Sequence, residues 1–110
     1  MVLKKKLVRD KIHEIYSHRP MHVADDKEYG LELAKKLQEE IDEYCLSGKV
    51  EELVDIIEVC YAISEFKGVS LKELEAMRID KANKRGKFKK RVIFDEVDTE
   101  KSLDFEDQQN

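Results

Sequence analysis

The sequence predicts an all-α protein, and three observations predict this class. Leu, Glu, Lys and Ala, which suit helices, are abundant, whereas the 110 residues include one proline and four glycines. Apolar residues recur at spacings of three and four, the period of an amphipathic helix. Gly48 and Gly68 directly follow two long periodic stretches, and glycine commonly ends a helix in this way. A chain of this length is expected to form one domain around a modest core.

Four helical segments are expected, and each has a local signal for an end. The first covers residues 7–17 and ends at His18-Arg19-Pro20, because the residue before a proline avoids helical angles. The second begins after Asp25 or Asp26 and runs to 46 or 47, with a core stripe of Leu33, Leu37, Ile41 and Tyr44. The third covers 50–67. The fourth opens on a capping box, Ser70 to Glu73, and ends near Arg85. Phe88 and residues 92–94 are expected to form a short extended segment that packs on the bundle.

The third helix is apolar on most of its sides. Only Glu51, Glu58 and Glu65 form a clear polar stripe along it. A helix of this kind is buried on most faces, and a single chain of this size has few helices to cover it. The sequence therefore predicts that a second subunit covers part of this helix.

The charges divide the chain into residues 1–94 and an acidic tail, residues 95–110. The tail contains seven acids and one lysine, so it sets the net charge of −4, and its composition predicts a flexible segment. The acidic balance argues against general nucleic-acid binding, although Lys81 to Arg91 holds seven bases and no acid. No signal peptide or membrane span is evident, which favours a cytoplasmic protein. Cys45 and Cys60 are expected to be buried free thiols.

Two pairs of acids interrupt the apolar stripes of the second and third helices. Glu40 and Glu43 are three residues apart, as are Glu52 and Asp55, and a short turn at Gly48 would make the two helices antiparallel neighbours. The four carboxylates would then converge and repel one another unless cations neutralised them. Ligation by oxygen alone suits Mg²⁺, with Mn²⁺ as a second possibility. The alternative is a charged, solvated helix face.

These acids also carry a family resemblance. Glu39-Glu40-x-x-Glu43 followed by Glu52-x-x-Asp55 resembles the EExxE…ExxD signature of the MazG-like all-α nucleotide pyrophosphohydrolases, which include dimeric dUTPases and phosphoribosyl-ATP pyrophosphohydrolase. Residues 6–12, KLVRDKI, and 81–88, KANKRGKF, resemble the opening and closing motifs of the short stand-alone branch. The resemblance covers roughly residues 4–94.

The resemblance implies a fold and a reaction. The fold would be a four-helix-bundle-type domain completed by formation of a homodimer or a dimer of dimers, and the reaction would be NTP + H₂O → NMP + PPi. By position, Glu40, Glu43, Glu52 and Asp55 would hold Mg²⁺, and Glu39 would orient or deprotonate water, which makes Glu39, Glu40 and Glu43 the expected catalytic acids. The basic end of the fourth helix, Lys81, Lys84 and Arg85, would contact the phosphates of the nucleoside triphosphate.

Some positions leave more than one interpretation. Arg9 and Asp10 would form either a structural ion pair or a substrate contact. His13 stands where the family usually has proline, and Lys87 replaces the second glycine of the closing motif, which puts fine positioning of the substrate in doubt. A different class of function is a non-catalytic helical dimer that binds nucleotide or a protein partner. A metal-storing carboxylate bundle is a weaker alternative, because no histidine joins the acids.

Overall fold

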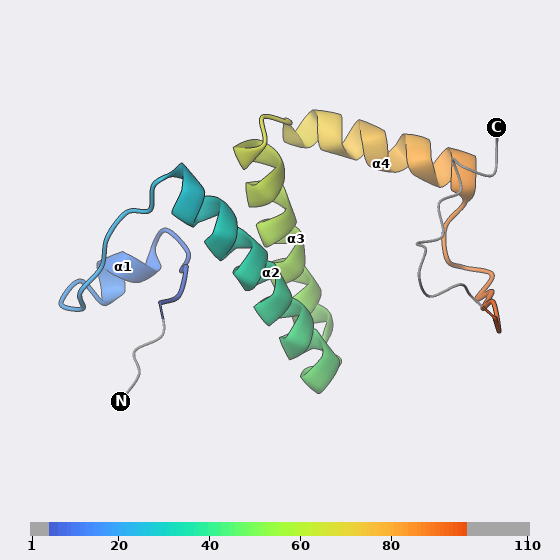
Figure 1. Ribbon diagram of the computed structural model, residues 1–110. Coiled ribbons are helices and arrows are strands. Elements are labelled where there is room, and N and C mark those ends of the chain that lie inside the picture. Colours follow the sequence, from blue (N-terminus) through green and yellow to red (C-terminus); the bar gives the residue numbers. More distant parts are fainter. Residues whose placement is uncertain (1–4, 97–110) are drawn as a thin grey trace. The chain divides into compact units, whose positions relative to one another are not determined.

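The described part of the chain, residues 5–96 of a computed structural model, is entirely helical apart from turns and irregular connections. It contains α1 (Ile12–Ile15), α2 (Asp26–Ser47), α3 (Val50–Phe66) and α4 (Leu71–Arg85), and no strand occurs within residues 5–96 (Figure 1). The all-α prediction is confirmed. No helix within this range is long and apolar enough to cross a membrane. Most of the predicted tail, residues 97–110, lies outside the described residues.

The chain divides into two units, Met1–Leu71 and Lys72–Asn110. The first unit holds α1, α2 and α3, and nearly all of α4 belongs to the second.

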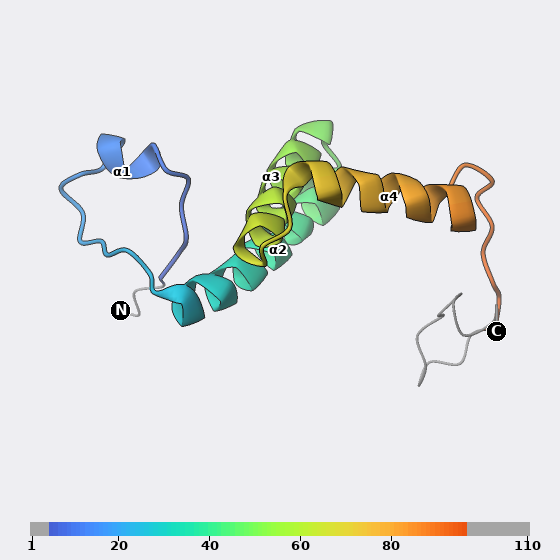
Figure 2. The ribbon, with the colours of Figure 1, turned by 90° about the horizontal axis from the view of Figure 1, so that it is seen from above.

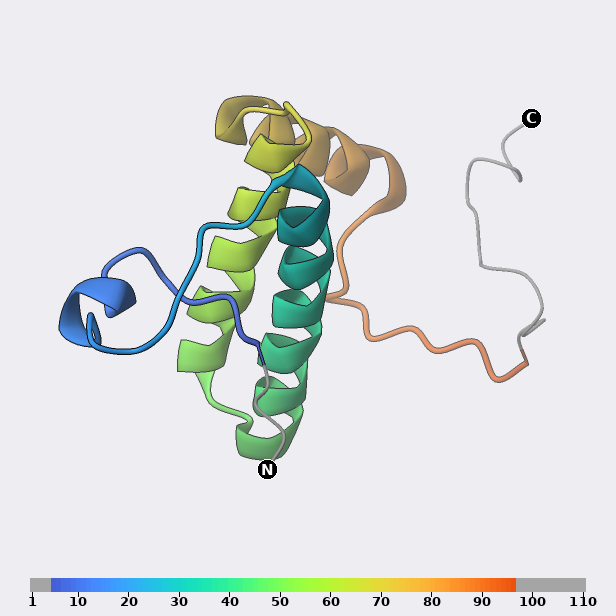
Figure 3. The ribbon, with the colours of Figure 1, turned by 60° about the vertical axis from the view of Figure 1, so that its left-hand side comes forward.

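Helices α2 and α3 form an antiparallel hairpin, and they are the extensively packed pair among the described helices (Figure 3). Asp25 is the N-cap of α2, and its Oδ1 accepts a hydrogen bond of 2.9 Å from the backbone N–H of Glu28. Gly48 ends α2 in the left-handed conformation, with φ of 66°, and lets the chain reverse within two residues. The predicted bounds of both helices are confirmed to within one or two residues.

The end of the hairpin away from Gly48 has close aromatic packing, and Gly68 lies in the turn that follows α3. The rings of Tyr29 and Phe66 meet edge to face with centroids 5.1 Å apart, beside Gly30, where an added Cβ would lie 3.1 Å from the Phe66 ring. After α3, the backbone N–H of Val69 donates to the Ser64 carbonyl, and the buried Ser64 hydroxyl donates to the Val69 carbonyl at 2.9 Å. These bonds satisfy groups that the end of α3 leaves free.

The core of this single chain is small. Leu33 and Val59, exposed by 2% and 9%, are the buried hydrophobic residues among those described. Ile41 and Tyr44, predicted to belong to the core stripe, are exposed, and so are Cys45 and Cys60, so the prediction of buried thiols is wrong for the isolated chain. The physical reason is that two antiparallel helices cover only one face of each other.

The predicted first helix is mostly absent. A helix over 7–17 was expected, but α1 contains only Ile12–Ile15, and its N-cap makes no side-chain hydrogen bond. Ile15 and Tyr16 are exposed. Short helices depend on packing of an apolar face against another element. Within residues 5–96 no element packs on Ile15 and Tyr16, so the period of the sequence alone is not sufficient to form the longer helix.

Helix α4 is a single uninterrupted helix that ends before Gly86, at which φ is 85° (Figure 2). Its predicted bounds are confirmed to within one residue. The expected extended segment beyond it is not found within residues 86–96: residues 91–94 form no strand, and Phe88 and Ile93 are 96% and 81% exposed. The apolar side chains of this stretch are therefore exposed among the described residues of the second unit, and the prediction that they pack is not confirmed.

Candidate functional site

The carboxylates predicted to converge do so in two overlapping groups. One group contains Glu39, Glu40 and Glu43, all on α2, and the other contains Glu40 with Glu52 and Asp55 of α3. Within each group, one carboxylate oxygen from each residue lies within 4.8 Å of the others. The hairpin explains this arrangement, because residues three apart share a helix face and the tight turn at Gly48 sets the two faces opposite each other. Glu40 belongs to both groups.

Glu40 is the most buried of these acids. It is 6% exposed, and one of its oxygens lies 3.3 Å from Nζ of Lys36, while Oε2 is buried with no hydrogen-bond partner among the described residues. Burial raises the pKa of Glu40 above its ordinary value, Lys36 opposes that rise, and the negative charge of Glu43 adds to it. Buried carboxylate oxygens are almost always paired, so an unpaired one points to a ligand.

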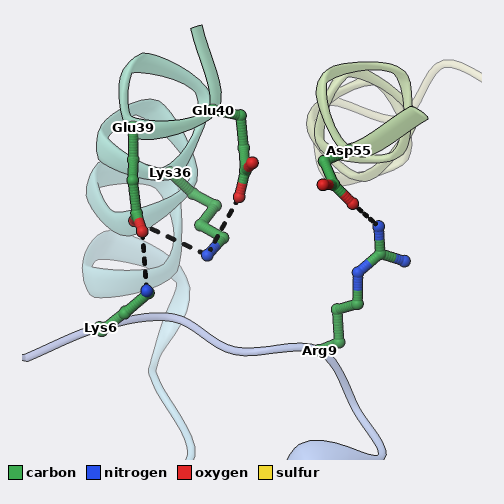
Figure 4. Close-up of polar contacts among 6 residues, drawn as sticks. All are labelled: Lys6, Arg9, Lys36, Glu39, Glu40 and Asp55. Carbon is green, nitrogen blue, oxygen red and sulfur yellow. Dashed lines mark hydrogen bonds and ion pairs between the residues drawn. The ribbon is translucent and has the colours of Figure 1, made fainter. Parts of the chain in front are cut away.

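Glu39 is held in the opposite way, by two lysines. Its carboxylate lies 2.7 Å from Nζ of Lys6 and 3.6 Å from Nζ of Lys36 (Figure 4). The hydrogen bond from Lys6, aided by the charge of Lys36, lowers the pKa of Glu39 in spite of partial burial. Glu39 is therefore ionised at neutral pH and accepts hydrogen bonds, as a residue that orients water must.

On α3, the two acids have different partners. Oδ1 of Asp55 accepts a hydrogen bond of 2.6 Å from Nη2 of Arg9, and Oε1 of Glu52 accepts one of 3.3 Å from the Ser47 hydroxyl at the end of α2. In Figure 4 the Arg9 side chain reaches Asp55 from the same stretch of chain that brings Lys6 to Glu39. Of the two interpretations of Arg9, the structure thus shows the ion pair. The side chain of Asp10 is exposed and has no hydrogen bond or ion pair within residues 5–96.

Two lysines at this site were missed by sequence reasoning. Lys36 precedes Glu39 and Glu40 by three and four residues, a spacing that predicts ion pairs on one helix, so it could have been found. Lys6 lies 33 positions from Glu39, and no spacing rule links them. The sequence signal for Lys6 was only its place in the KLVRDKI stretch.

The predicted phosphate-binding residues lie in the second unit, near the end of α4. Lys81 and Lys84 are exposed, Arg85 is half-buried, and Nζ of Lys84 is 3.1 Å from Oδ2 of Asp80. The helix dipole favours bases at this end whether or not they bind phosphate. Their role therefore stays a prediction.

The donor set is suited to hard cations. All members of both groups are carboxylates, and small divalent ions such as Mg²⁺ and Mn²⁺ prefer oxygen ligands. Oε2 of Glu40, which is buried and has no hydrogen-bond partner within residues 5–96, lies at the junction of the groups. The residues present therefore fit a divalent cation.

Comparison of the chain with protein-family models, characterised proteins and solved structures gives no significant match. The MazG-like relationship stays an expectation from the three sequence motifs.

Proposed function

We propose that this protein is a Mg²⁺-dependent nucleoside triphosphate pyrophosphohydrolase, which converts NTP and water to NMP and pyrophosphate. The observation that supports this most directly is the buried carboxylate of Glu40, which belongs to two acid groups and has one unpartnered oxygen. The motif resemblance supplies the reaction, and the acid groups of α2 and α3 supply carboxylate ligands for a cation. Removal of surplus or non-standard nucleotides is the role that would suit such an activity.

Glu40, Glu43, Glu52 and Asp55 would hold the Mg²⁺. The bound metal would neutralise phosphate charge and lower the pKa of coordinated water. Mn²⁺ is the nearest substitute, because it accepts the same oxygen ligands.

Side chains of the protein would assist the attack of water and the departure of pyrophosphate. Glu39, ionised and hydrogen-bonded to Lys6, would orient the water whose oxygen attacks the α-phosphorus or accept its proton. The bond from the α-phosphorus to the bridging oxygen breaks, and that oxygen leaves with pyrophosphate. Lys81, Lys84 and Arg85 are proposed to hold the departing pyrophosphate, Arg85 through its planar fork and the lysines as point charges.

We also propose that the active form is a homodimer, or a dimer of such dimers. Val54, Ile57 and Tyr61 follow one line on α3, and they are 60%, 49% and 37% exposed. A contiguous apolar stripe of this kind marks an interaction surface. A two-fold related copy would place the same stripe on both subunits and complete a four-helix arrangement. The same arrangement would cover Cys60.

The deciding experiment measures pyrophosphate release from a panel of NTPs and dNTPs, with Mg²⁺ and with chelator. Wild type is compared with Glu43→Gln, which removes a charge from the exposed acid of the first group, and with Glu51→Gln, a matched control on the exposed stripe of α3. We expect Mg²⁺-dependent release that falls at least about 100-fold in Glu43→Gln, because loss of even an indirect metal contact costs 10–100-fold. Glu51→Gln should keep wild-type activity.

The same panel tests the non-catalytic alternative. A helical dimer that only binds nucleotide would release no pyrophosphate from any triphosphate, with or without metal. That result would contradict the proposed reaction and leave nucleotide or partner binding as the function to pursue.

A further inference from the structure

Two of the three bases at the acid groups come from the N-terminal segment, residues 5–11. Lys6 reaches Glu39 and Arg9 reaches Asp55, so one short stretch of chain contacts an acid of α2 and an acid of α3 (Figure 4). Residues 5–9 have no helix or strand structure. The segment is therefore held to the hairpin in part by its cationic side chains.

The charges at the site leave room for a cation. The five acids of the two groups carry −5 when ionised, and Lys6, Arg9 and Lys36 together carry +3. The remaining −2 equals the charge of one divalent ion. A second divalent ion would make the site positive unless some of these bases moved away, because like charges in a partly dry space repel strongly.

The three bases are not held equally. Lys36 projects from within α2 and its side chain is 17% exposed, whereas the side chains of Lys6 and Arg9 are each 55% exposed. Exposed ion pairs contribute little to stability. When a cation binds, Arg9 and Lys6 are the bases that can leave at small cost.

The ion pair that a bound cation would break is the one between Arg9 and Asp55. Oδ1 of Asp55 accepts the guanidinium at 2.6 Å, and Asp55 belongs to the same group as the buried Glu40, whose Oε2 has no partner. A cation bound between Glu40 and Asp55 would meet the positive charge of Arg9 on the Asp55 side. The cation and the guanidinium therefore compete for Asp55.

We propose that residues 5–11 form a cation-responsive strap, in which Arg9 neutralises Asp55 until a divalent cation displaces it. The freed guanidinium then lies at the edge of the acid groups, where it is available to an anionic ligand such as a phosphate group. Arg9 has two successive partners in this account, first Asp55 and then the anion. The inference rests on the cation site of the proposed function, but it does not require hydrolysis.

The first test is the affinity for Mn²⁺ alone, measured by electron paramagnetic resonance without nucleotide. Wild type is compared with Arg9→Gln and with Lys67→Gln, which removes the same charge from the exposed C-cap of α3 in the same unit. We expect Arg9→Gln to bind Mn²⁺ about three- to tenfold more tightly, since it loses both a competitor and a repelling charge. Lys67→Gln should match wild type. Equal or weaker binding by Arg9→Gln, or no binding by any variant, would overturn the proposal.

A second measurement follows the strap itself in a chain that keeps Arg9. The sequence contains no tryptophan, so Lys5→Trp introduces a single fluorescent reporter at an exposed position of the segment. Mg²⁺ should change its emission in a saturable way, and combining Lys5→Trp with Glu40→Gln should abolish the change. Tryptophan emission that does not change with Mg²⁺ would mean that the segment does not move, which would contradict the proposal. Neither readout depends on pyrophosphate release, so failure of the proposed reaction would be recognised separately.

Discussion

The two faces of α3 reverse the usual distribution of polar and apolar side chains. The face toward α2 carries Glu52 and Asp55 before it continues into the buried Val59, whereas the outer face carries Val54 and Ile57, both well exposed. In an ordinary two-helix contact, the carboxylates would face water and the valine and isoleucine would face the neighbouring helix. The proposed cation site and the proposed second subunit would each account for one half of this reversal.

The two faces also differ in whether another part of the chain already contacts them. The inner face already has partial charge compensation from within the chain, because Arg9 pairs with Asp55. The outer face has no covering element among the described helices, because α2 is the only one extensively packed against α3. In the proposed function, the first face contributes ligands to a cation and the second contacts another copy of the chain.

The largest effect is expected from placing a charge on the outer face. Ile57→Lys should weaken self-association at least about 100-fold, because both copies of a two-fold interface would lose about 1.5–3 kcal/mol of apolar burial and gain a buried charge. Sedimentation velocity over a range of concentrations measures the change. Val23→Lys, which places the same charge on a 97% exposed apolar residue outside α3, is the control and should leave association unchanged. A wild-type monomer, or a dimer indifferent to Ile57→Lys, would contradict the assignment of this face.

Glu40 of α2, which lies opposite the inner face of α3, is probed by the pH dependence of the free energy of unfolding in the presence of chelator. The raised pKa of Glu40 means that the folded state holds this proton more tightly than the unfolded state. The contribution of Glu40 is therefore most favourable below its ordinary pKa of 4.5 and is lost as pH rises through the raised value. Glu40→Gln, which keeps an acceptor for Lys36, should be about 1 kcal/mol more stable than wild type at pH 7 and lose this advantage at pH 4.

Urea denaturation at the two pH values measures this difference, with Glu58→Gln as an exposed control. Added Mg²⁺ should reverse the order at pH 7, since a cation that binds only the folded wild type stabilises it. A difference between wild type and Glu40→Gln that is the same at pH 4 and pH 7 would show that burial of this carboxylate has no cost.

The smallest effect concerns Cys60, which lies beside the outer stripe and is exposed in the single chain. If a second copy covers this face, maleimide should label Cys60 about fivefold faster in Ile57→Lys than in wild type, because thiol reactivity follows exposure. Peptide mass spectrometry separates Cys60 from Cys45. Equal labelling rates would place the interface elsewhere on the helix.

The parts of the fold that were predictable have local signals. The N-cap Asp25 and the glycines after α2 and α3 fix three helix ends, and each acts within a few residues of its own position. The predicted first helix is mostly absent because its stability depends on an apolar face that no element within residues 5–96 covers, and the periodicity of a sequence does not show whether such a face is covered. Exposure of both cysteines was missed for the same reason.

The candidate site shows the same division between local and distant information. Convergence of Glu40 with Glu52 and Asp55 follows from a three-residue spacing and a short turn, so the sequence was sufficient. It was not predictable that one oxygen of Glu40 has no partner among the described residues, because this depends on where the Lys36 side chain lies relative to Glu39 and Glu40. The contact from Arg9 to Asp55 joins residues 46 positions apart, and only the folded chain reveals it.

Because Glu40 is shared, the two acid groups do not tolerate sequence drift equally at every position. Replacing Glu43 leaves the group of Glu40, Glu52 and Asp55 complete, and replacing Glu52 leaves the other group complete. Replacing Glu40 dismantles both groups at once. In evolutionary terms, a duplicate gene that lost Glu40 would lose both acid groups in one substitution, whereas one that lost an outer acid would keep one group complete.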